Sequence, residues 1–348
     1  MSAQNPHPTM RDVADLAGVS PMTVSRALHN DPNVAPSSVS AVLAAVDRLG
    51  YRRNEAARVL RTGRPHDLLG LVITNLANPF YAQLAVGVER FAAAHGQRVV
   101  IGNSADDPGR ERELLDDFRS QRVSGLVVVP SGPDQRHLAP DVLDGVPVAL
   151  AARPPRGVEL DCVLVDDAGG ARDLTASLVA VGHERIGFIG LPTTSWAGEQ
   201  RLDGHLSALA AAGIAADADL LGSTDRLAGT AEDVARRLLA LPRPPTALVA
   251  ANNRITVGAY RAIRQNAQST ALAGFDDLDF ADLLGHRLTV AAYDPALVGE
   301  TAAALVLDRL RSPDSTRQPA RRRRIPVVVK QYRTLGDDPP VDVLREQL

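Results

Sequence analysis

A chain of 348 residues can form two or three domains, and its net charge of −3 excludes a protein that binds polyanions over its whole surface. The single cysteine, Cys162, excludes an intrachain disulfide and is typical of a reducing cytoplasm. The N-terminus lacks the apolar segment of a secretory signal peptide, and no apolar run reaches the length of a membrane span, so we expect neither secretion nor membrane insertion.

The charge is unevenly distributed along the chain. Residues 1–65 hold eight arginines against five acidic residues, a net charge of +3, which leaves −6 for the remainder. A basic N-terminal segment followed by an acidic body is typical of a protein that contacts nucleic acid at one end only. Aromatic residues make up 3% of the chain, which argues against a stacking surface for single-stranded nucleic acid.

Residues 10–29 predict two short helices joined by a tight turn. Gly18 stands at the turn, Ser20 is suited to cap the second helix, and Pro21 falls where a missing N–H costs nothing. Apolar residues are spaced so that the two helices face each other: Val13, Ala14, Ala17, Val19, Val24 and Ala27. An ordinary amphipathic hairpin would share part of this pattern. The coincidence of spacing, turn and cap favours a helix-turn-helix whose second helix enters a DNA groove.

A third helix is predicted over residues 35–50, and an arginine-rich segment follows it. The apolar positions of the third helix are Val39, Val42, Leu43, Val46 and Leu49. Residues 51–66 form either a disordered linker or a short helix that folds only when another structure holds it.

From Leu68 onward, apolar strand-like runs alternate with amphipathic helices. The predicted strands are 68–73, 98–101, 125–129, 146–151, 162–165, 186–190, 246–250 and 271–275, and the predicted helices lie at about 79–95, 109–121, 169–181, 199–212, 230–241 and 255–265. These units are too many for one sheet, so we expect two similar parallel α/β lobes. A helix at about 295–311 and a strand at 325–329 would carry the chain back between them, with Arg321–Arg324 in a solvated loop.

These motifs closely resemble the LacI family of bacterial transcriptional repressors. DVADLAGVSPMTVSRAL resembles its helix-turn-helix, RRNEAARVLRTGR its hinge, ANPFYAQLAVGVE the start of its first lobe and VGHERIGFIG the start of its second; RLDGH, PTALVAANN, GFDD and HRLTV follow in order. The resemblance implies an all-α helix-turn-helix head at 1–50, a hinge at 51–66 and a two-lobed, periplasmic-binding-protein-like α/β body with parallel sheets at 67–340. Lobe 1 would comprise about 67–164 and 289–323, and lobe 2 about 165–288 and 324–340.

The resemblance also implies which head and hinge residues meet DNA. Pro21, Met22 and Arg26 would face bases, Arg26 as a bidentate donor to guanine or, alternatively, in a phosphate contact or an intraprotein ion pair. Thr23 and Ser25 are candidates for phosphate contacts. In the hinge, Leu60 would be a wedge in the minor groove, with Arg58 and Arg61 beside the phosphates.

In the body, the resemblance implies an effector site between the lobes. Phe80 and Tyr81 would form one wall, Arg201 and Asp276 would be polar clamps, and Asn252 would be a further contact. Trp196 could stack on a ligand or pack in the rim. Two positions depart from the family pattern: Asn253 stands where an aspartate is usual, and Ala152 where many relatives carry an acid.

Together these features predict a cytoplasmic, homodimeric repressor that binds palindromic double-stranded DNA and is controlled by a small molecule, with no cofactor and no metal. A carbohydrate is the first candidate for the effector, and a nucleobase-like or phosphorylated ligand the second. A sugar-binding receptor would share the two-lobed body, but it would carry a signal peptide in place of the head. A helix-turn-helix protein with a catalytic body is the other alternative, although the chain has no Walker A, H-E-x-x-H or G-x-S-x-G motif and no G-x-G-x-x-G after its first strand.

Overall fold

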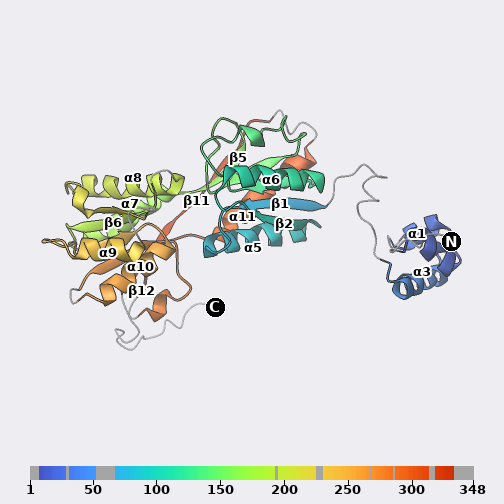
Figure 1. Ribbon diagram of the computed structural model, residues 1–348, viewed down its shortest axis with the longest axis horizontal. Helices are drawn as coiled ribbons and strands as arrows, with labels where there is room; N and C mark the ends of the chain where they lie inside the picture. Colours follow the sequence, from blue (N-terminus) through green and yellow to red (C-terminus); the bar gives the residue numbers. More distant parts are fainter. Residues whose placement is uncertain are drawn as a thin grey trace, which may run out of the picture. The chain divides into compact units, whose positions relative to one another are not determined.

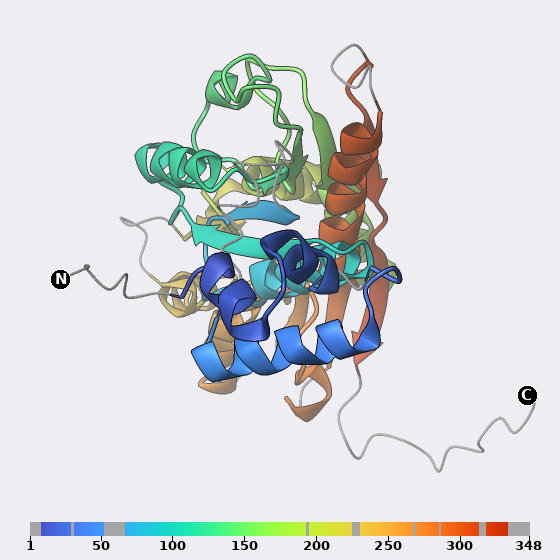
Figure 2. The same cartoon turned by 90° about the vertical axis from the view of Figure 1, so that its right-hand side faces the viewer.

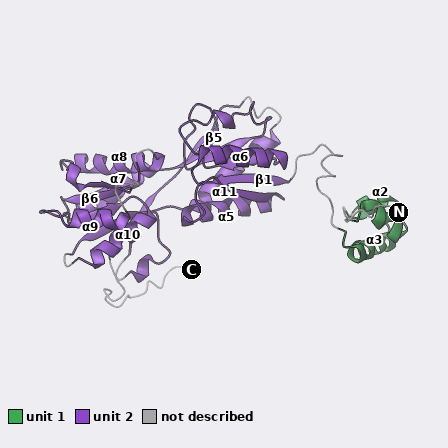
Figure 3. Ribbon diagram, viewed as in Figure 1, with its two compact units in different colours: residues 1–66 green, residues 67–348 purple. Residues whose placement is uncertain are grey.

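The computed structural model describes residues 8–28, 31–51, 67–192, 195–224, 230–266, 269–284, 287–312 and 318–332. The chain forms two compact units, Met1–His66 and Asp67–Leu348 (Figure 3). The first unit is called the head below, and the second the body.

The head contains three helices, α1 (Met10–Ala17), α2 (Pro21–Ala27) and α3 (Pro36–Leu49). Thr9 and Asp12 form a reciprocal capping box at the start of α1, and Ser20 Oγ accepts the Thr23 N–H at the start of α2. Gly18 ends α1 with a φ of 65°, which confirms the predicted turn.

A small apolar core holds the three helices together. Its buried members are Val13, Ala14, Val24, Ala27, Val42 and Ala45. The predicted facing of α1 and α2 is therefore confirmed. Leu43 was predicted on the same apolar face of α3, but it is half exposed, and Ala45 fills the core in its place.

The body consists of two lobes, each built on a six-stranded sheet. The sheet of lobe 1 has the order β11-β5-β4-β3-β1-β2 and is parallel throughout, with β1 (Leu68–Ile73), β2 (Arg98–Asn103), β3 (Gly125–Val128), β4 (Val148–Ala151), β5 (Asp161–Val165) and β11 (Arg322–Ile325). Alternate residues of these strands point to opposite faces of the sheet. One face packs on α5 (Pro79–Ala94) and α11 (Pro295–Arg311), and the other on α6 (Pro108–Ser120). Figure 2 shows α6 in teal and α11 in red on the two sides.

Two glycines bring α5 and α11 into backbone contact. A Cβ at Gly87 would lie 1.9 Å from the carbonyl oxygen of Ala296, and a Cβ at Gly299 would lie 2.0 Å from that of Leu84. Only glycine permits so close an approach.

Lobe 2 has the strand order β12-β10-β9-β8-β6-β7, in which β12 alone is antiparallel to its neighbour. Its strands are β6 (Ile186–Gly190), β7 (Leu221–Ser223), β8 (Ala247–Ala250), β9 (Ala271–Phe275), β10 (Leu288–Ala292) and β12 (Val328–Tyr332). Helices α7 (Asp167–Ala180) and α8 (Trp196–Ala211) cover one face, and α9 (Ala231–Leu239) and α10 (Asn253–Arg264) cover the other (Figure 1). Short 3-10 turns lie at Arg136–Leu138, Ala218–Leu220 and Ala281–Leu283.

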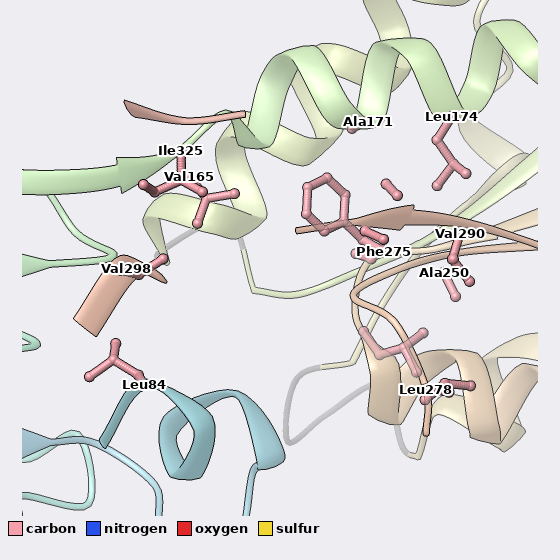
Figure 4. Packing of buried hydrophobic residues seen from close by; sticks show 14 of the residues in the cluster. Leu84, Val165, Ala171, Leu174, Ala250, Phe275, Leu278, Val290, Val298 and Ile325 are labelled. Atoms are coloured by element: carbon pink, nitrogen blue, oxygen red, sulfur yellow. The ribbon is translucent and has the colours of Figure 1, made fainter. Parts of the chain in front are cut away.

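The chain crosses between the lobes three times among the described residues, after β5, after β10 and between β11 and β12. One continuous apolar cluster runs through this region, from Leu84 and Val298 in lobe 1, past Val165 and Ile325 at the crossings, to Phe275 in lobe 2 (Figure 4). The lobes therefore share apolar packing at their connection.

Three predictions about the C-terminal part were wrong. Arg322–Arg324 belong to strand β11 rather than to a loop, and the predicted strand 325–329 is the end of β11 and the start of β12, separated by Pro326 and Val327. Strand β10 pairs with β9 and β12, so residues 289–292 lie in lobe 2 and not in lobe 1. An edge strand needs hydrogen bonds on one side only, which lets arginines occupy β11 while their side chains reach water.

Candidate functional site

Helix α2 presents an exposed surface at its N-terminal end. Pro21 and Met22 are exposed, and 64% of Met22 is accessible to solvent. An exposed methionine with no role in the head core is available for contact with another molecule. Thr23 and Ser25 are partly buried beside it, and Thr23 Oγ1 shares a hydrogen bond of 2.9 Å with Ser20 Oγ.

Arg26 projects from the same helix with 60% of its side chain exposed. Its Nε lies 3.9 Å from Asp31 Oδ2, which is a long and solvated ion pair. A contact of this kind stabilises little, so it does not hold the guanidinium in place. The hinge residues Arg58, Leu60 and Arg61 lie outside the described residues, and their roles stay predictions.

The carboxyl ends of the strands of both lobes open onto the space between the lobes, which is where parallel α/β sheets bind ligands. A cleft of about 990 Å³ lies there. From lobe 1 it is lined by Asn75, Asn78, Tyr81, Asp106 and Arg153, and from lobe 2 by Thr224, Asn252, Arg254, Ile255 and Arg261, among others.

The lobe 2 side of the interlobe region is held by Arg201, which comes from α8 and is 5% exposed. Its Nε donates to Asp167 Oδ1 at 2.7 Å, and its Nη1 donates to the carbonyl oxygen of Ala251 at 2.6 Å. Its Nη2 lies 2.7 Å from Asp167 and 3.5 Å from Asp276. The guanidinium carbon also lies 3.7 Å from the centroid of the Phe275 ring, a cation–π contact.

These partners keep Arg201 charged. Burial alone would lower the pKa of Arg201, but the carboxylates of Asp276 and Asp167 outweigh that effect and raise it. Each terminal nitrogen of the guanidinium already has a partner within the protein. In this structure Arg201 bonds to Asp167 and Ala251 and lies close to Asp276, and its predicted role as a clamp on a ligand stays a prediction.

Asp276 follows strand β9 and is the more accessible member of this cluster. It adopts a φ of 67°, a conformation that side-chain-bearing residues rarely take, and Tyr293 donates a hydrogen bond of 2.9 Å to its Oδ1. It lines a smaller cavity of about 90 Å³ that also contains Phe80, Asn253 and Tyr293. Backbone strain at a polar residue in a cleft is a common feature of ligand sites.

The remaining predicted effector residues lie around the same interlobe space. Phe80 and Tyr81 stand at the start of α5, with their rings 4.9 Å apart in an edge-to-face arrangement. Asn252 lines the larger cleft, but its Oδ1 caps α10 by accepting the Ile255 N–H. Trp196, the first residue of α8, lines a separate interlobe cavity.

Sequence reasoning missed several residues of this region. Asn253 Nδ2 donates to Asn78 Oδ1 across the lobes at 3.4 Å, and Arg153 Nη1 donates to Asp106 Oδ1 at 2.6 Å. Asp167 and Tyr293 were missed too, because neither belongs to a motif. Their positions at the start of a helix after β5 and directly after β10 would have placed them at the carboxyl edge.

Comparison with known proteins identifies the architecture. A model of periplasmic binding proteins and the sugar-binding domain of the LacI family matches residues 66–333, and a model of bacterial regulatory proteins of the lacI family matches residues 9–54. The chain belongs to the LacI family.

Relatives of this LacI-family chain are transcriptional regulators. It is 34% identical to the HTH-type transcriptional regulator GalS of Salmonella typhimurium, over 86% of this chain and 89% of GalS. The structure of the transcriptional regulator CelR–cellobiose complex matches with 29% identity and a TM-score of 0.67, over 93% of this chain and 98% of that one. The lac repressor dimer bound to operator and the anti-inducer ONPF has the same fold, with a TM-score of 0.81 at 24% identity over 95% and 100% of the two chains.

The chain is therefore a LacI-family helix-turn-helix transcriptional regulator with an effector-binding body. None of the helices in the described residues has the length and apolarity needed to cross a membrane. Within the same residues, no group of three or more His, Cys, Asp and Glu side chains is arranged to hold a metal ion.

Proposed function

We propose that this LacI-family regulator is a cytoplasmic, homodimeric repressor whose affinity for a palindromic operator is set by a neutral sugar bound between the lobes. The observation that carries this proposal is the state of the two predicted clamps. Arg201 donates to Asp167 and to the Ala251 carbonyl and forms an ion pair of 3.5 Å with Asp276, whereas the Asp276 side chain lines the smaller cavity. The group presented to a ligand there is an acceptor.

An acceptor of this kind favours a ligand that donates hydrogen bonds. Asp277 and Asp279 line the same cavity as Asp276, so a phosphate or carboxylate would meet like charge at that end. Sugar hydroxyls donate readily to carboxylates, and hydrogen bonds to charged groups are the stronger ones. The complex of the relative CelR with cellobiose supports a saccharide as the class of effector.

The DNA contacts that we propose follow the predicted positions in the head and hinge. Arg26 would donate to a guanine in the major groove, Pro21 and Met22 would contact thymine methyl groups, and Thr23 and Ser25 would contact phosphates. Exposure of Met22 and Arg26 supports this assignment. In the hinge, Leu60 would enter the minor groove with Arg58 and Arg61 at the phosphates.

The dimer that we propose is supported by apolar residues exposed on lobe 1. Val86 on α5 is 53% exposed and Ile101 on the edge strand β2 is 45% exposed. A second copy packed against α5 and β2 would remove both from water, and a two-fold dimer matches a palindromic site.

A sugar that contacts both lobes would favour one lobe arrangement over the other. Relative movement of the lobes would then alter the start of β1, where the hinge joins the body. Coupling energies between two such sites are typically about 1–3 kcal/mol, which corresponds to roughly 5–150-fold in operator affinity. We further propose that the body binds its ligand without converting it, as its regulator relatives support.

The test has a DNA arm and an effector arm. Selection from random duplexes should yield a palindrome, and Arg26→Ala should relax base preference at one position of each half-site without abolishing binding. Selection that returns no enriched duplex would refute the DNA-binding proposal.

In the effector arm, Asp276→Asn should keep operator binding but weaken sugar binding at least about ten-fold, the loss expected for a charge-assisted hydrogen bond. The matched control is Asp173→Asn, which removes the same charge from an exposed position on α7 that does not line the cavity. Equal responses in parent and Asp276→Asn proteins would remove Asp276 from the effector site.

A further inference from the structure

The strand β11 is an edge strand of the sheet in lobe 1, and one of its sides is open. Among the described residues, β5 is the only strand that pairs with it. The carbonyl of Arg321, directly before β11, accepts the Cys162 N–H of β5 at 2.9 Å. Backbone groups point alternately to the two sides of a strand, so those of Arg322 and Arg324 face away from β5. Such a row of backbone donors and acceptors is able to pair with a further strand.

The side chains of Arg322 and Arg324 lie on the same face of the sheet and reach water, with 65% and 69% of each exposed. Arg322 lies 4.0 Å from Glu159, which is itself 79% exposed, and Arg324 lies 3.2 Å from Asp166. Exposed ion pairs of this kind stabilise little. Neither pair therefore prevents its guanidinium group from bonding to a carboxylate of another molecule.

A buried carboxylate fixes the start of β11. Asp161, the first residue of β5, is 3% exposed. It accepts the Arg321 backbone N–H at 2.7 Å and bonds to the guanidinium groups of Arg321 and Arg309 at 2.8 and 2.7 Å. These bonds join β5, the last turn of α11 and the residue before β11. The strand is thus held in place before a partner arrives, which lowers the entropic cost of binding.

A small apolar cavity adjoins the same end of β11. Its volume is about 80 Å³, and Gln318 and Ala320, which lead into the strand, line it. Most of the lining is apolar and comes from the segments before β4 and β5 and from the first residue of β4: Pro140, Val146, Pro147, Val148 and Leu160. Pockets for small molecules usually measure about 300–1,000 Å³, so this cavity has room for a side chain rather than for a whole ligand.

We infer that the open side of β11 is a docking site for an acidic, extended segment of a partner protein. The segment adds a strand to the sheet of lobe 1, and its backbone pairs with that of Arg322 and Arg324. Carboxylates at alternate positions face these two guanidinium groups, and an apolar side chain at its end enters the cavity beside Ala320. In this mode of recognition the main-chain bonds give affinity, and the side chains give specificity.

The surroundings of β11 favour such a segment over a nucleic acid or a second copy of this chain. The chain after residue 65 has a net charge of −6, which repels a polyanion, and an apolar cavity has no use in binding phosphates. Two copies of β11 paired with each other would place arginines opposite arginines, and like charges directly opposite each other destabilise a sheet. The proposed dimer uses β2, which lies at the other edge of the sheet, so the two surfaces do not compete.

The probe for this site is a labelled synthetic octapeptide of alternating glutamate and valine. It is titrated into the full-length protein and followed by fluorescence anisotropy. One control peptide has the same composition with its glutamates in one block, and another carries an N-methyl group on every second amide, tested in both registers. We expect the alternating peptide to bind at least about ten-fold more tightly than either control, because the first misplaces its carboxylates and the second loses backbone hydrogen bonds.

Variants of β11 locate the binding. Arg322→Gln combined with Arg324→Gln should weaken binding of the alternating peptide at least about ten-fold, since both charge-assisted contacts are lost. The matched control, Arg110→Gln combined with Arg112→Gln, removes the same charge from exposed positions on α6 and should bind like the parent. Arg324→Pro also removes a backbone N–H from the open side and leaves the pairing with β5 in place, so it should bind more weakly than Arg324→Gln. Melting temperatures of all the variants show whether the body stays folded.

Two results would overturn the inference. If either control peptide or inorganic polyphosphate binds as tightly as the alternating peptide, the arginines attract anions without strand pairing. If no peptide binds, or if the double variants of β11 and α6 bind equally, the arginines serve only to keep an edge strand from aggregating, and β11 is not a docking site.

Discussion

Replacing Arg201 with methionine tests whether this arginine stabilises the folded body by neutralising the buried carboxylates of Asp167 and Asp276, or contributes little to stability and serves only to bind a ligand. The change keeps much of the side-chain length and removes the charge. It deletes the bonds to Asp167 and Ala251, the approach to Asp276 and the contact with the Phe275 ring. Two carboxylates then remain in a nearly dry environment, since Asp167 is 4% and Asp276 8% exposed.

The expected cost is large because an unpaired buried charge is left behind. Removal of one partner from a buried ion pair destabilises a protein by about 3–5 kcal/mol. At roughly 2–4 °C per kcal/mol, the melting temperature of the body should fall by on the order of 10 °C. Urea unfolding followed by circular dichroism gives the free energy directly.

Two further variants sharpen this test. The double variant Arg201→Met with Asp167→Asn should recover part of the loss, because one of the stranded carboxylates is gone. Arg172→Met removes an arginine that is 54% exposed and paired with Asp173, and it should change stability by no more than about 1 kcal/mol. If Arg201→Met is as mild as Arg172→Met, the guanidinium does not hold the cluster and is free to meet a ligand.

Two other expectations concern buried groups of the body. Burial lowers the pKa of His205 to about 4, below the ordinary value near 6.5, so the unfolded chain takes up a proton first and stability falls as the pH drops from about 6.5 toward 4. Between pH 7 and 5 the parent should lose about 2 kcal/mol more than His205→Gln in urea titrations, and parallel pH profiles would contradict this. Glu111→Gln should cost about 1–3 kcal/mol and speed amide hydrogen exchange at Ser131, whose N–H it accepts; unchanged exchange would show that the loop is fixed by other contacts.

Local rules explain how much of the fold the sequence predicted. The head followed from a turn glycine, the Ser20 cap and apolar spacing, because its helices are specified within a few residues. The strand β1 was predicted with its observed ends because it is a continuous apolar run, and the helix α11 because its apolar residues recur at helical spacing. Strand β7 has only three residues and was missed, and β11 was mistaken for a loop because its arginines have no strand-like alternation.

The sequence predicted which residues lie at the site, but it did not predict which of their side chains bond to one another. The residues Arg201 and Asp276 came from a resemblance, and the structure does bring them 3.5 Å apart. Asp167 lies 34 residues before Arg201 in the chain, and Tyr293 follows Asp276 by 17. No spacing rule covers such pairs, because the order of strands in the sheet decides which loop ends meet.

The strand order has a consequence for synthesis of the protein. The free side of β5 is closed by residues 322–325, and that of β10 by residues 328–332. While the nascent chain leaves the ribosome, β5 and β10 are edge strands with unpaired backbone N–H and C=O groups until β11 and β12 emerge. Exposed edge strands promote aggregation. A product truncated near residue 320 would leave both lobes unfinished at once, so we expect it to precipitate rather than to persist as a shorter regulator.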